Sequence, residues 1–404
     1  ESIYSYICCY HYFLFHLFNR LMQQYDYIIT GSGVSGLMLA YRMAKDSFFD
    51  DASILIIDKE KKTTNDRTWC YWEKDNGEWD DLIYKSWKKI LFESNSYHNT
   101  IPLQSYAYKM IRSAKFYEKL WDFIATKKNI SFTEATVVSI QQKAEGASVK
   151  TLTNQYHAVK VINSIDFNQK YTQQEEFPVL LQHFTGWFIE TKKNYFDDSV
   201  ATFMDFTVDQ KKNTRFMYVL PIAPNKALFE YTLFSKDVLP KEEYERELQK
   251  YLASKSITEY TIIEKEKGII PMTSYKFWKE NSKNVLHIGT VGGWTKASTG
   301  YTFKNTSKKS IELIAFLKTE NNFINFRKKT RFWFYDLLML DVLSTHNHLG
   351  SKLFSKLFQR NSLKNVFRFL DEETSFIEDL KIMLSMPPLR FVLALFKRLF
   401  NLKN

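Results

Sequence analysis

The sequence predicts an α/β fold that begins with a Rossmann-type dinucleotide-binding unit. A short apolar run at residues 27–29 leads into a G-x-G-x-x-G turn, and a helical apolar pattern follows the turn. Between residues 131 and 165 apolar and polar side chains alternate, which indicates short strands, and residues 161–164 are expected to return to the parallel sheet. After Thr306 the pattern is mostly helical.

The glycine turn has the spacing that lets a backbone hold a pyrophosphate. The residues that we expect to contact the dinucleotide are Gly31, Ser32, Gly33, Val34, Ser35 and Gly36. The first glycine allows the tight turn, the second allows close approach of the phosphates, and the third allows the helix to pack on the strand. The helix N-terminus attracts the phosphates through its free N–H groups and its dipole.

A second apolar strand, at residues 54–57, ends at Asp58. This carboxylate follows the glycine turn at about the spacing expected for a group that binds a ribose hydroxyl. The complete unit of strand, turn, helix, second strand and acid therefore predicts a dinucleotide site. On this pattern alone, the dinucleotide is NAD or FAD.

The middle of the chain predicts further paired strands and one amphipathic helix. Residues 217–220 and 227–229 are expected to pair around a turn at 221–226. Residues 241–256 have helical spacing, with Tyr244, Leu248, Tyr251 and Leu252 on the inward face.

Composition limits the partners. The chain has 404 residues, a formal net charge of +11 and 17% aromatic residues. The basic excess suits nucleic acid or an anionic membrane, but no helix-turn-helix, zinc-finger or RNA-binding signature accompanies it. We therefore expect a membrane surface rather than nucleic acid as a partner. The aromatic excess fits either an AT-rich genome or a large apolar pocket. The three cysteines offer no disulfide framework, which is typical of a reducing compartment.

Residues 1–23 form an unusual N-terminal extension. It begins with Glu1 and lacks both a basic start and a small-residue cleavage site, so it is a poor signal peptide. We expect the natural start to be Met22 and the preceding residues to be non-native. An interfacial anchor is the alternative.

Several long strings resemble the lycopene cyclases of carotenoid-making bacteria. They are DRTWCYWE (66–73), LLQHFTGWFIET (180–191), FMDFTVDQ (203–210), RFMYVLPIAPNKALFEYTLFS (215–235), GIIPMT (268–273) and HIGTVGGWTKASTGYTF (287–303). The resemblance extends from about Tyr25 to at least Leu340.

The resemblance implies an aromatic-hydroxylase-like architecture: a Rossmann-type FAD-binding domain, an antiparallel-sheet substrate domain and a helical C-terminal region. We expect the FAD domain at 24–90, 131–170 and 265–310, the substrate domain at 91–130 and 171–264, and the helical region at 311–404. Reduced FAD, with NADPH as reductant, is the implied cofactor. Its further contacts are expected at Arg67, Gly289, Gly292 and Gly293. At position 294 the family usually has Met where this chain has Trp, and at position 297 it often has Pro where this chain has Ala. These two differences leave the glycines of the turn in place.

The implied activity is conversion of lycopene to β-carotene by acid-initiated carbocation cyclisation, without net redox change. In the family, the glutamate that matches Glu230 is implicated in catalysis, although a strand glutamate more often faces solvent. Asp205 and Asp209 are secondary candidates. Their spacing of four is expected to place them on one face, where they would assist the acid or hold structural hydrogen bonds. His183 is a candidate catalytic base, but we prefer to interpret it as a hydrogen-bonded structural histidine.

The C-terminal tail, 382–404, has an apolar stripe with interspersed Arg and Lys. It fits either a basic interfacial helix or a helix that closes the substrate domain. Since lycopene is a long hydrocarbon, we expect a cytoplasmic enzyme peripheral to the inner membrane. The alternative function is an FAD-dependent isoprenoid oxidoreductase, similar to geranylgeranyl reductases or monooxygenases, which would consume NADPH or oxygen.

Overall fold

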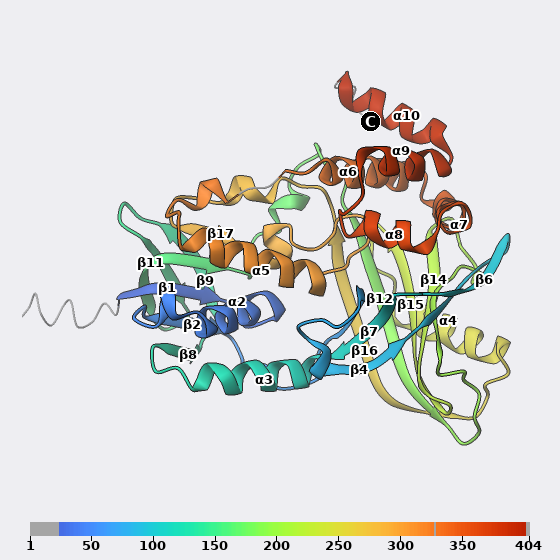
Figure 1. The fold of residues 1–404 in the computed structure, drawn as a ribbon, viewed down its shortest axis with the longest axis horizontal. Coiled ribbons are helices and arrows are strands. Elements are labelled where there is room, and N and C mark those ends of the chain that lie inside the picture. The colour runs from blue at the N-terminus through green and yellow to red at the C-terminus, as the bar shows by residue number, and fades with distance from the viewer. Residues whose placement is uncertain (1–23, 327–328, 401–404) are drawn as a thin grey trace, which may run out of the picture.

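The computed structural model describes residues 24–326 and 329–400, in two seven-stranded sheets, a three-stranded sheet and surrounding helices. Figure 1 shows the first large sheet beside the second, with a layer of C-terminal helices over the second. The expectations for residues 1–23 lie outside the described residues. In the described part of the chain, every helix is too short or too polar to cross a bilayer.

The first sheet confirms the Rossmann-type prediction. Its strand order is β8 (Ile130–Glu134), β2 (Ile54–Asp58), β1 (Gln24–Thr30), β11 (Gln155–Asn163), β10 (Ala147–Thr151) and β9 (Val137–Gln142), with β17 (Val285–His287) also paired to β11. β1 pairs in parallel with both β2 and β11, so the turn after β1 opens at the carboxyl edge of the sheet. Against it pack α2 (Val34–Lys45), α3 (Ser113–Ala125) and α5 (Phe303–Leu317).

The second sheet is largely antiparallel. Its strand order is β16 (Tyr260–Met272), β12 (Leu180–Thr191), β15 (Lys226–Ser235), β14 (Thr214–Ala223), β13 (Val200–Asp205), β5 (Lys89–Ser94) and β6 (Tyr97–Pro102). The predicted hairpin is confirmed as β14 and β15, and the predicted amphipathic helix is confirmed as α4 (Lys241–Ser254).

Alternation along β15 decides which way Glu230 faces. Phe229 and Tyr231 pack with the buried face of α4. Leu228 and Phe234 pack on the opposite face, with the C-terminal helices. Because successive strand residues point to opposite faces, Glu230 lies on the face away from α4.

The small sheet joins the two large ones. It consists of β3 (Thr68–Lys74), β7 (Tyr106–Arg112) and β4 (Ile83–Trp87), in the order β3-β7-β4. The string DRTWCYWE forms most of β3, whose Tyr71 packs in the core of the first sheet and whose Trp72 packs in the core of the second.

The described residues of the C-terminal region are mostly helical, in agreement with the sequence. Its helices are α6 (Arg331–Thr345), α7 (Gly350–Arg360), α8 (Leu363–Leu370), α9 (Phe376–Ser385) and α10 (Pro388–Leu399). α10 is fixed to α6 by Arg398, which donates two hydrogen bonds to Asp341 (2.6 and 2.8 Å), and by the buried Ala394.

Two segments depart from the expected domain boundaries. The region 91–130 was expected in the substrate domain: β5 and β6 lie in the second sheet, but α3 buries Phe116 and Leu120 in the same core as Leu37 of α2. The apolar face of α3 therefore packs against the Rossmann unit. The region from 265 was expected in the FAD domain, but β16 remains paired with β12 as far as Met272.

Candidate active site

A cavity of about 920 Å³, here called the central cleft, lies between the first and second large sheets. Its lining includes Gly33 and Ser35 from the first glycine turn, Gly289 from the second, and Glu230 from β15. One continuous space therefore connects the dinucleotide turns with the candidate acid. Such a cavity is in the size range of small-molecule sites.

Each glycine of the first turn has the geometry that its predicted role needs. Gly31 has a φ of 90°, and a Cβ there would lie 2.2 Å from Ser164 Oγ. A Cβ on Gly36 would lie 1.9 Å from the Gly31 carbonyl oxygen, so only glycine lets α2 pack this closely on the turn. A Cβ on Gly33 would meet nothing within 4 Å. Gly33 therefore leaves a bare stretch of backbone facing the cleft.

Asp58 contacts the turn itself. Its Oδ2 accepts hydrogen bonds from the Ser32 backbone N–H (2.5 Å) and hydroxyl (2.8 Å), and its Oδ1 accepts from the Lys59 N–H (2.6 Å). The carboxylate is buried and is not among the residues that line the cleft. In this conformation it orders the glycine turn.

The second glycine turn meets the first. Gly289 has a φ of 64°, and a Cβ there would lie 2.8 Å from Ser35 Oγ at the start of α2. A Cβ on Gly292 would lie 2.3 Å from the His287 carbonyl oxygen, so this turn is also closely packed; Gly293, with a φ of 67°, completes it. The two glycine turns thus form adjacent parts of one cradle.

Polar atoms in the cleft are left without partners. Gln182 Oε1 and Thr299 Oγ1 are buried, have no hydrogen-bond partner among the described residues, and belong to residues that line the cleft. Arg67 also lines it, with its guanidinium donating to the Asp66 carbonyl (2.7 Å). Because buried polar atoms are normally satisfied, the orphaned atoms fit a polar ligand that completes their hydrogen bonds.

Glu230 lies in the cleft next to a second carboxyl group. It accepts a hydrogen bond from Thr232 Oγ1 (2.8 Å) and hydrogen-bonds with Glu266 of β16. Burial raises the pKa of Glu230 above its ordinary value, and repulsion from Glu266 raises it further. A carboxyl group in this environment keeps its proton at neutral pH, as a general acid must.

Glu266 is not among the site residues that the sequence predicted. The signal that could have found it is the alternation Glu264, Glu266, Gly268 just before the string GIIPMT, which places two carboxylates on one face of β16. Alternation alone does not reveal the strand order that brings Glu266 near Glu230.

Aromatic hydroxyl groups surround the acid. Tyr301 OH lies 3.4 Å from the hydroxyls of both Tyr108 and Tyr218, and all three residues line the cleft with Cys70. Burial raises the pKa of each of these tyrosines and of the thiol, so they are neutral at physiological pH. Among the described residues, the side chains that act on Glu230 are therefore uncharged, apart from Glu266.

Asp205 and Asp209 are not among the cleft-lining residues, and the expectation that they share one face is wrong. Asp205 is fully buried and accepts hydrogen bonds from Tyr251 OH (2.7 Å) and Thr207 Oγ1 (2.6 Å). Asp209 is exposed in a turn and accepts from the Lys211 N–H (3.3 Å). β13 ends at Asp205, so the strand period does not continue to Asp209.

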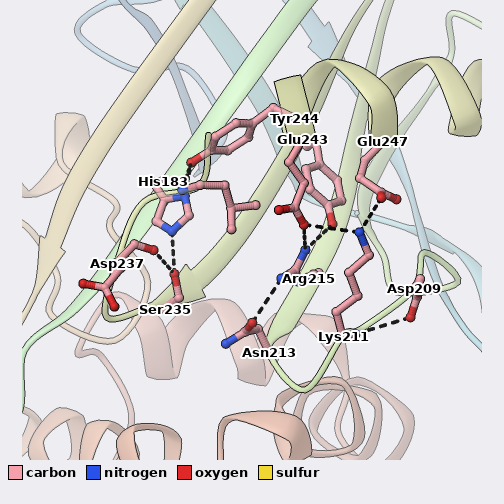
Figure 2. Close-up of polar contacts among 12 residues, drawn as sticks. His183, Asp209, Lys211, Asn213, Arg215, Ser235, Asp237, Glu243, Tyr244 and Glu247 are labelled. Carbon is pink, nitrogen blue, oxygen red and sulfur yellow. Dashed lines mark hydrogen bonds and ion pairs between the residues drawn. The ribbon is translucent and has the colours of Figure 1, made fainter. Parts of the chain in front are cut away.

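His183 is a structural histidine, as preferred. Figure 2 shows its ring between Tyr244 and Ser235, whose oxygens lie 2.5 Å from Nδ1 and 2.6 Å from Nε2. The Ser235 hydroxyl in turn donates to the Asp237 carbonyl (2.5 Å). Burial lowers the pKa of His183 to about 4, so the ring is neutral. It holds β12, β15 and α4 together and is not among the cleft-lining residues.

Comparisons with solved structures agree with this fold. A geranylgeranyl bacteriochlorophyll reductase-like protein from Thermoplasma acidophilum is 13% identical, with a TM-score of 0.58, and the match covers 91% of this chain and 98% of that one. A halogenase in complex with FAD is also 13% identical, with a TM-score of 0.54 over 86% of this chain and 79% of that one.

Comparisons of the sequence identify the family. The lycopene β-cyclase of Pantoea ananas is 24% identical over 300 residues, which cover 70% of this chain and 72% of the relative. The family model for lycopene cyclase protein matches residues 26–395. The chain therefore belongs to the lycopene cyclase family.

Proposed function

We propose that this carotenoid-cyclase family member is a lycopene β-cyclase that binds FAD in the two glycine turns and starts ring closure with the proton of Glu230. The observation that carries the proposal is the continuity of the central cleft, in which Gly33 and Gly289 share one lining with Glu230. A cyclase of this kind requires a protonated carboxyl group in an apolar pocket beside its cofactor.

The residues present fit FAD. Gly33 leaves the space that a pyrophosphate needs, and the N-terminus of α2 supplies free N–H groups beside it. The second turn, with Gly289, Gly292 and Gly293, and Arg67 are proposed to contact the rest of the cofactor. The FAD-containing halogenase shares the fold, which supports this choice of dinucleotide.

The chemical step is a proton transfer followed by ring closure. The O–H bond of Glu230 breaks and a C–H bond forms on the terminal double bond of the polyene. The internal double bond then attacks the resulting carbocation and closes the ring. A ring C–H bond breaks, its electron pair forms the ring double bond, and the proton passes to water, so that one proton is gained and one is lost for each ring and the net change is an isomerisation.

The aromatic lining and Glu230 itself would stabilise the cation. Tyr108, Tyr218 and Tyr301 keep their hydroxyl protons and present aromatic faces, which attract cations. The Glu230 carboxylate left after donation stabilises the cation electrostatically. When bound in its reduced form, with NADPH as reductant, FAD would supply further negative charge.

We further propose that α9 and α10 attach the enzyme to an anionic bilayer, from which it would take its hydrocarbon substrate. The exposed apolar residues of these helices are Phe376, Ile377, Leu380, Leu384, Leu389, Val392, Leu393, Phe396 and Leu399. Exposed basic residues, Lys381, Arg390 and Lys397, lie among them. Apolar and basic residues on one surface fit an anionic membrane.

Expression in a bacterium that accumulates lycopene tests the proposed function. The expected result is replacement of lycopene by β-carotene in the extracted pigments. Pigments that remain lycopene, with the protein folded and loaded with flavin, would contradict it. A reduced rather than cyclised pigment would instead support the oxidoreductase alternative.

A further inference from the structure

Glu230 and Glu266 face each other across a glycine. In the register of the second sheet, Gly186 of β12 pairs with Glu230 on one side and with Glu266 on the other. Paired residues point to the same face of a sheet, and neighbouring strands lie about 4.8 Å apart. The two carboxyl groups can therefore approach each other over the bare backbone of Gly186.

The absence of a side chain at Gly186 is what permits this approach. A Cβ there would lie 2.9 Å from Glu266 Cγ and 3.0 Å from Leu228 Cδ1. A side chain at position 186 would push the Glu266 side chain away from β12, and so away from Glu230. The sheet is therefore shaped around the pair.

The two carboxyl groups have unequal surroundings. Burial raises the pKa of Glu266 as well, and repulsion from Glu264 adds to this. A hydrogen bond from Thr68 Oγ1 (2.7 Å) and the positive charge of Arg112 act in the opposite direction and favour its ionised form. For Glu230, the Thr232 hydroxyl is the group among the described residues that favours the ionised form, and no cation of that part of the chain acts on it. The negative charge of the pair therefore belongs on Glu266 and the proton on Glu230.

The other groups that face the pair leave this assignment unchanged. Arg112 pairs with Glu264 (2.5 Å) and lies over the Phe188 ring at 4.2 Å, so its position is fixed. On the side of Glu230 the facing groups are neutral: Cys70 of β3, Tyr218 of β14 and Tyr301.

We propose that Glu266 is a positioning residue that shares one proton with Glu230 and keeps that proton on Glu230 until it is transferred to the substrate. Glu266 is not among the cleft-lining residues, so it does not contact the substrate and acts through the proton of Glu230 and through its own charge. This inference deepens the proposed function and rests on it.

The pair has a second consequence for the transfer step. Once Glu230 has donated its proton, both carboxylates are ionised, and two negative charges lie on the side of the cleft where the cation forms. A lone glutamate would supply only one. The repulsion that makes Glu230 hold its proton is therefore relieved by the cation that the transfer creates.

An infrared titration tests the shared proton without depending on activity. The carbonyl band of protonated Glu230 is followed against pH in the FAD-loaded protein and is assigned by its loss in Glu230→Gln. In Glu266→Gln the band should disappear at a pH lower than in the unsubstituted protein by about one pH unit or more, because the repulsion is removed. Gly186→Ala, which keeps both carboxyl groups but separates them, should change the titration in the same direction.

Glu190→Gln is the matched control, because Glu190 lies on β12 of the same sheet and pairs with Lys226 at 3.5 Å. It should titrate as the unsubstituted protein does. If Glu266→Gln, with flavin bound, leaves the Glu230 titration unchanged, the shared proton is refuted even if the protein cyclises lycopene. If lycopene is not cyclised but the titration changes as expected, the pair stands and the proposed function fails.

In an active preparation, the pH above which cyclisation declines should fall in Glu266→Gln together with the infrared titration. A purely structural role for Glu266 would lower activity equally at every pH, and this result would also overturn the proposal.

Discussion

A substitution at Gly33 tests the cofactor site, because an added methyl group there should weaken FAD binding without destabilising the fold. Gly33 has φ −70° and ψ −173°, which alanine adopts without strain, and a Cβ meets nothing within 4 Å. Gly33→Ala should therefore fold with little loss of stability. Its methyl group would occupy the space into which the pyrophosphate must fit.

The size of the effect follows from the cost of overpacking. Forcing a methyl group into a closely fitted contact costs about 1–3 kcal/mol, which corresponds to roughly 5- to 150-fold weaker binding. FAD binding to the apoprotein, followed by flavin fluorescence, should weaken by this factor in Gly33→Ala. The melting temperature without FAD should change little.

Gly36→Ala is the matched comparison. Its Cβ would lie 1.9 Å from the Gly31 carbonyl oxygen, a contact within the protein itself, so this variant should lose stability even without FAD. If Gly33→Ala binds FAD as tightly as the unsubstituted protein, the cofactor is not held at this turn.

Three further predictions concern stability, pH and the membrane. Lys296→Met should lower the free energy of unfolding by about 3–5 kcal/mol in chemical denaturation, because it leaves the buried Asp336 (2.9 Å away) without its cation. Lys308→Met, which removes one partner of an exposed pair, should lower it by less than about 1 kcal/mol. Equal losses of stability in the two variants would contradict this reasoning. Thr232→Val removes a hydrogen bond that lowers the pKa of Glu230, so the pKa should rise and cyclisation should persist to higher pH; a decline at lower pH would refute the assignment. The double variant Leu393→Asp, Phe396→Asp should lose binding to anionic vesicles without a change in melting temperature. The control Leu152→Asp, at an exposed leucine outside the C-terminal helices, should bind normally. Retained binding of the double variant would exclude α10 as the attachment site.

The parts of the structure that the sequence predicted depend on local patterns. The Gly31 turn, the inward face of α4 and the hairpin of β14 and β15 each follow from neighbouring residues, and all three are confirmed. The face of Glu230 also follows from strand alternation, because Leu228 and Phe234 pack on one face of β15 and Phe229 and Tyr231 on the other.

The parts that it missed depend on the order of strands. Glu266 meets Glu230 only because β12 lies between β15 and β16, and no local pattern reports that order. The prediction that Asp205 and Asp209 share one face was wrong for a related reason. It assumed that both residues belong to one strand or helix, but β13 ends at Asp205 and the chain turns there. The packing of α3 against α2 is likewise a contact between distant segments.

In the proposed reaction Glu230 donates the proton of a cyclisation without net redox change. Its most direct test is the reaction of lycopene in deuterated water with flavin-loaded protein, analysed by mass spectrometry, with NADPH oxidation followed in parallel. The expected result is a cyclic product that carries a solvent deuteron for each ring, NADPH oxidation that does not scale with product, and no product from flavin-loaded Glu230→Gln. Full activity of Glu230→Gln, or NADPH consumed in proportion to product, would contradict it.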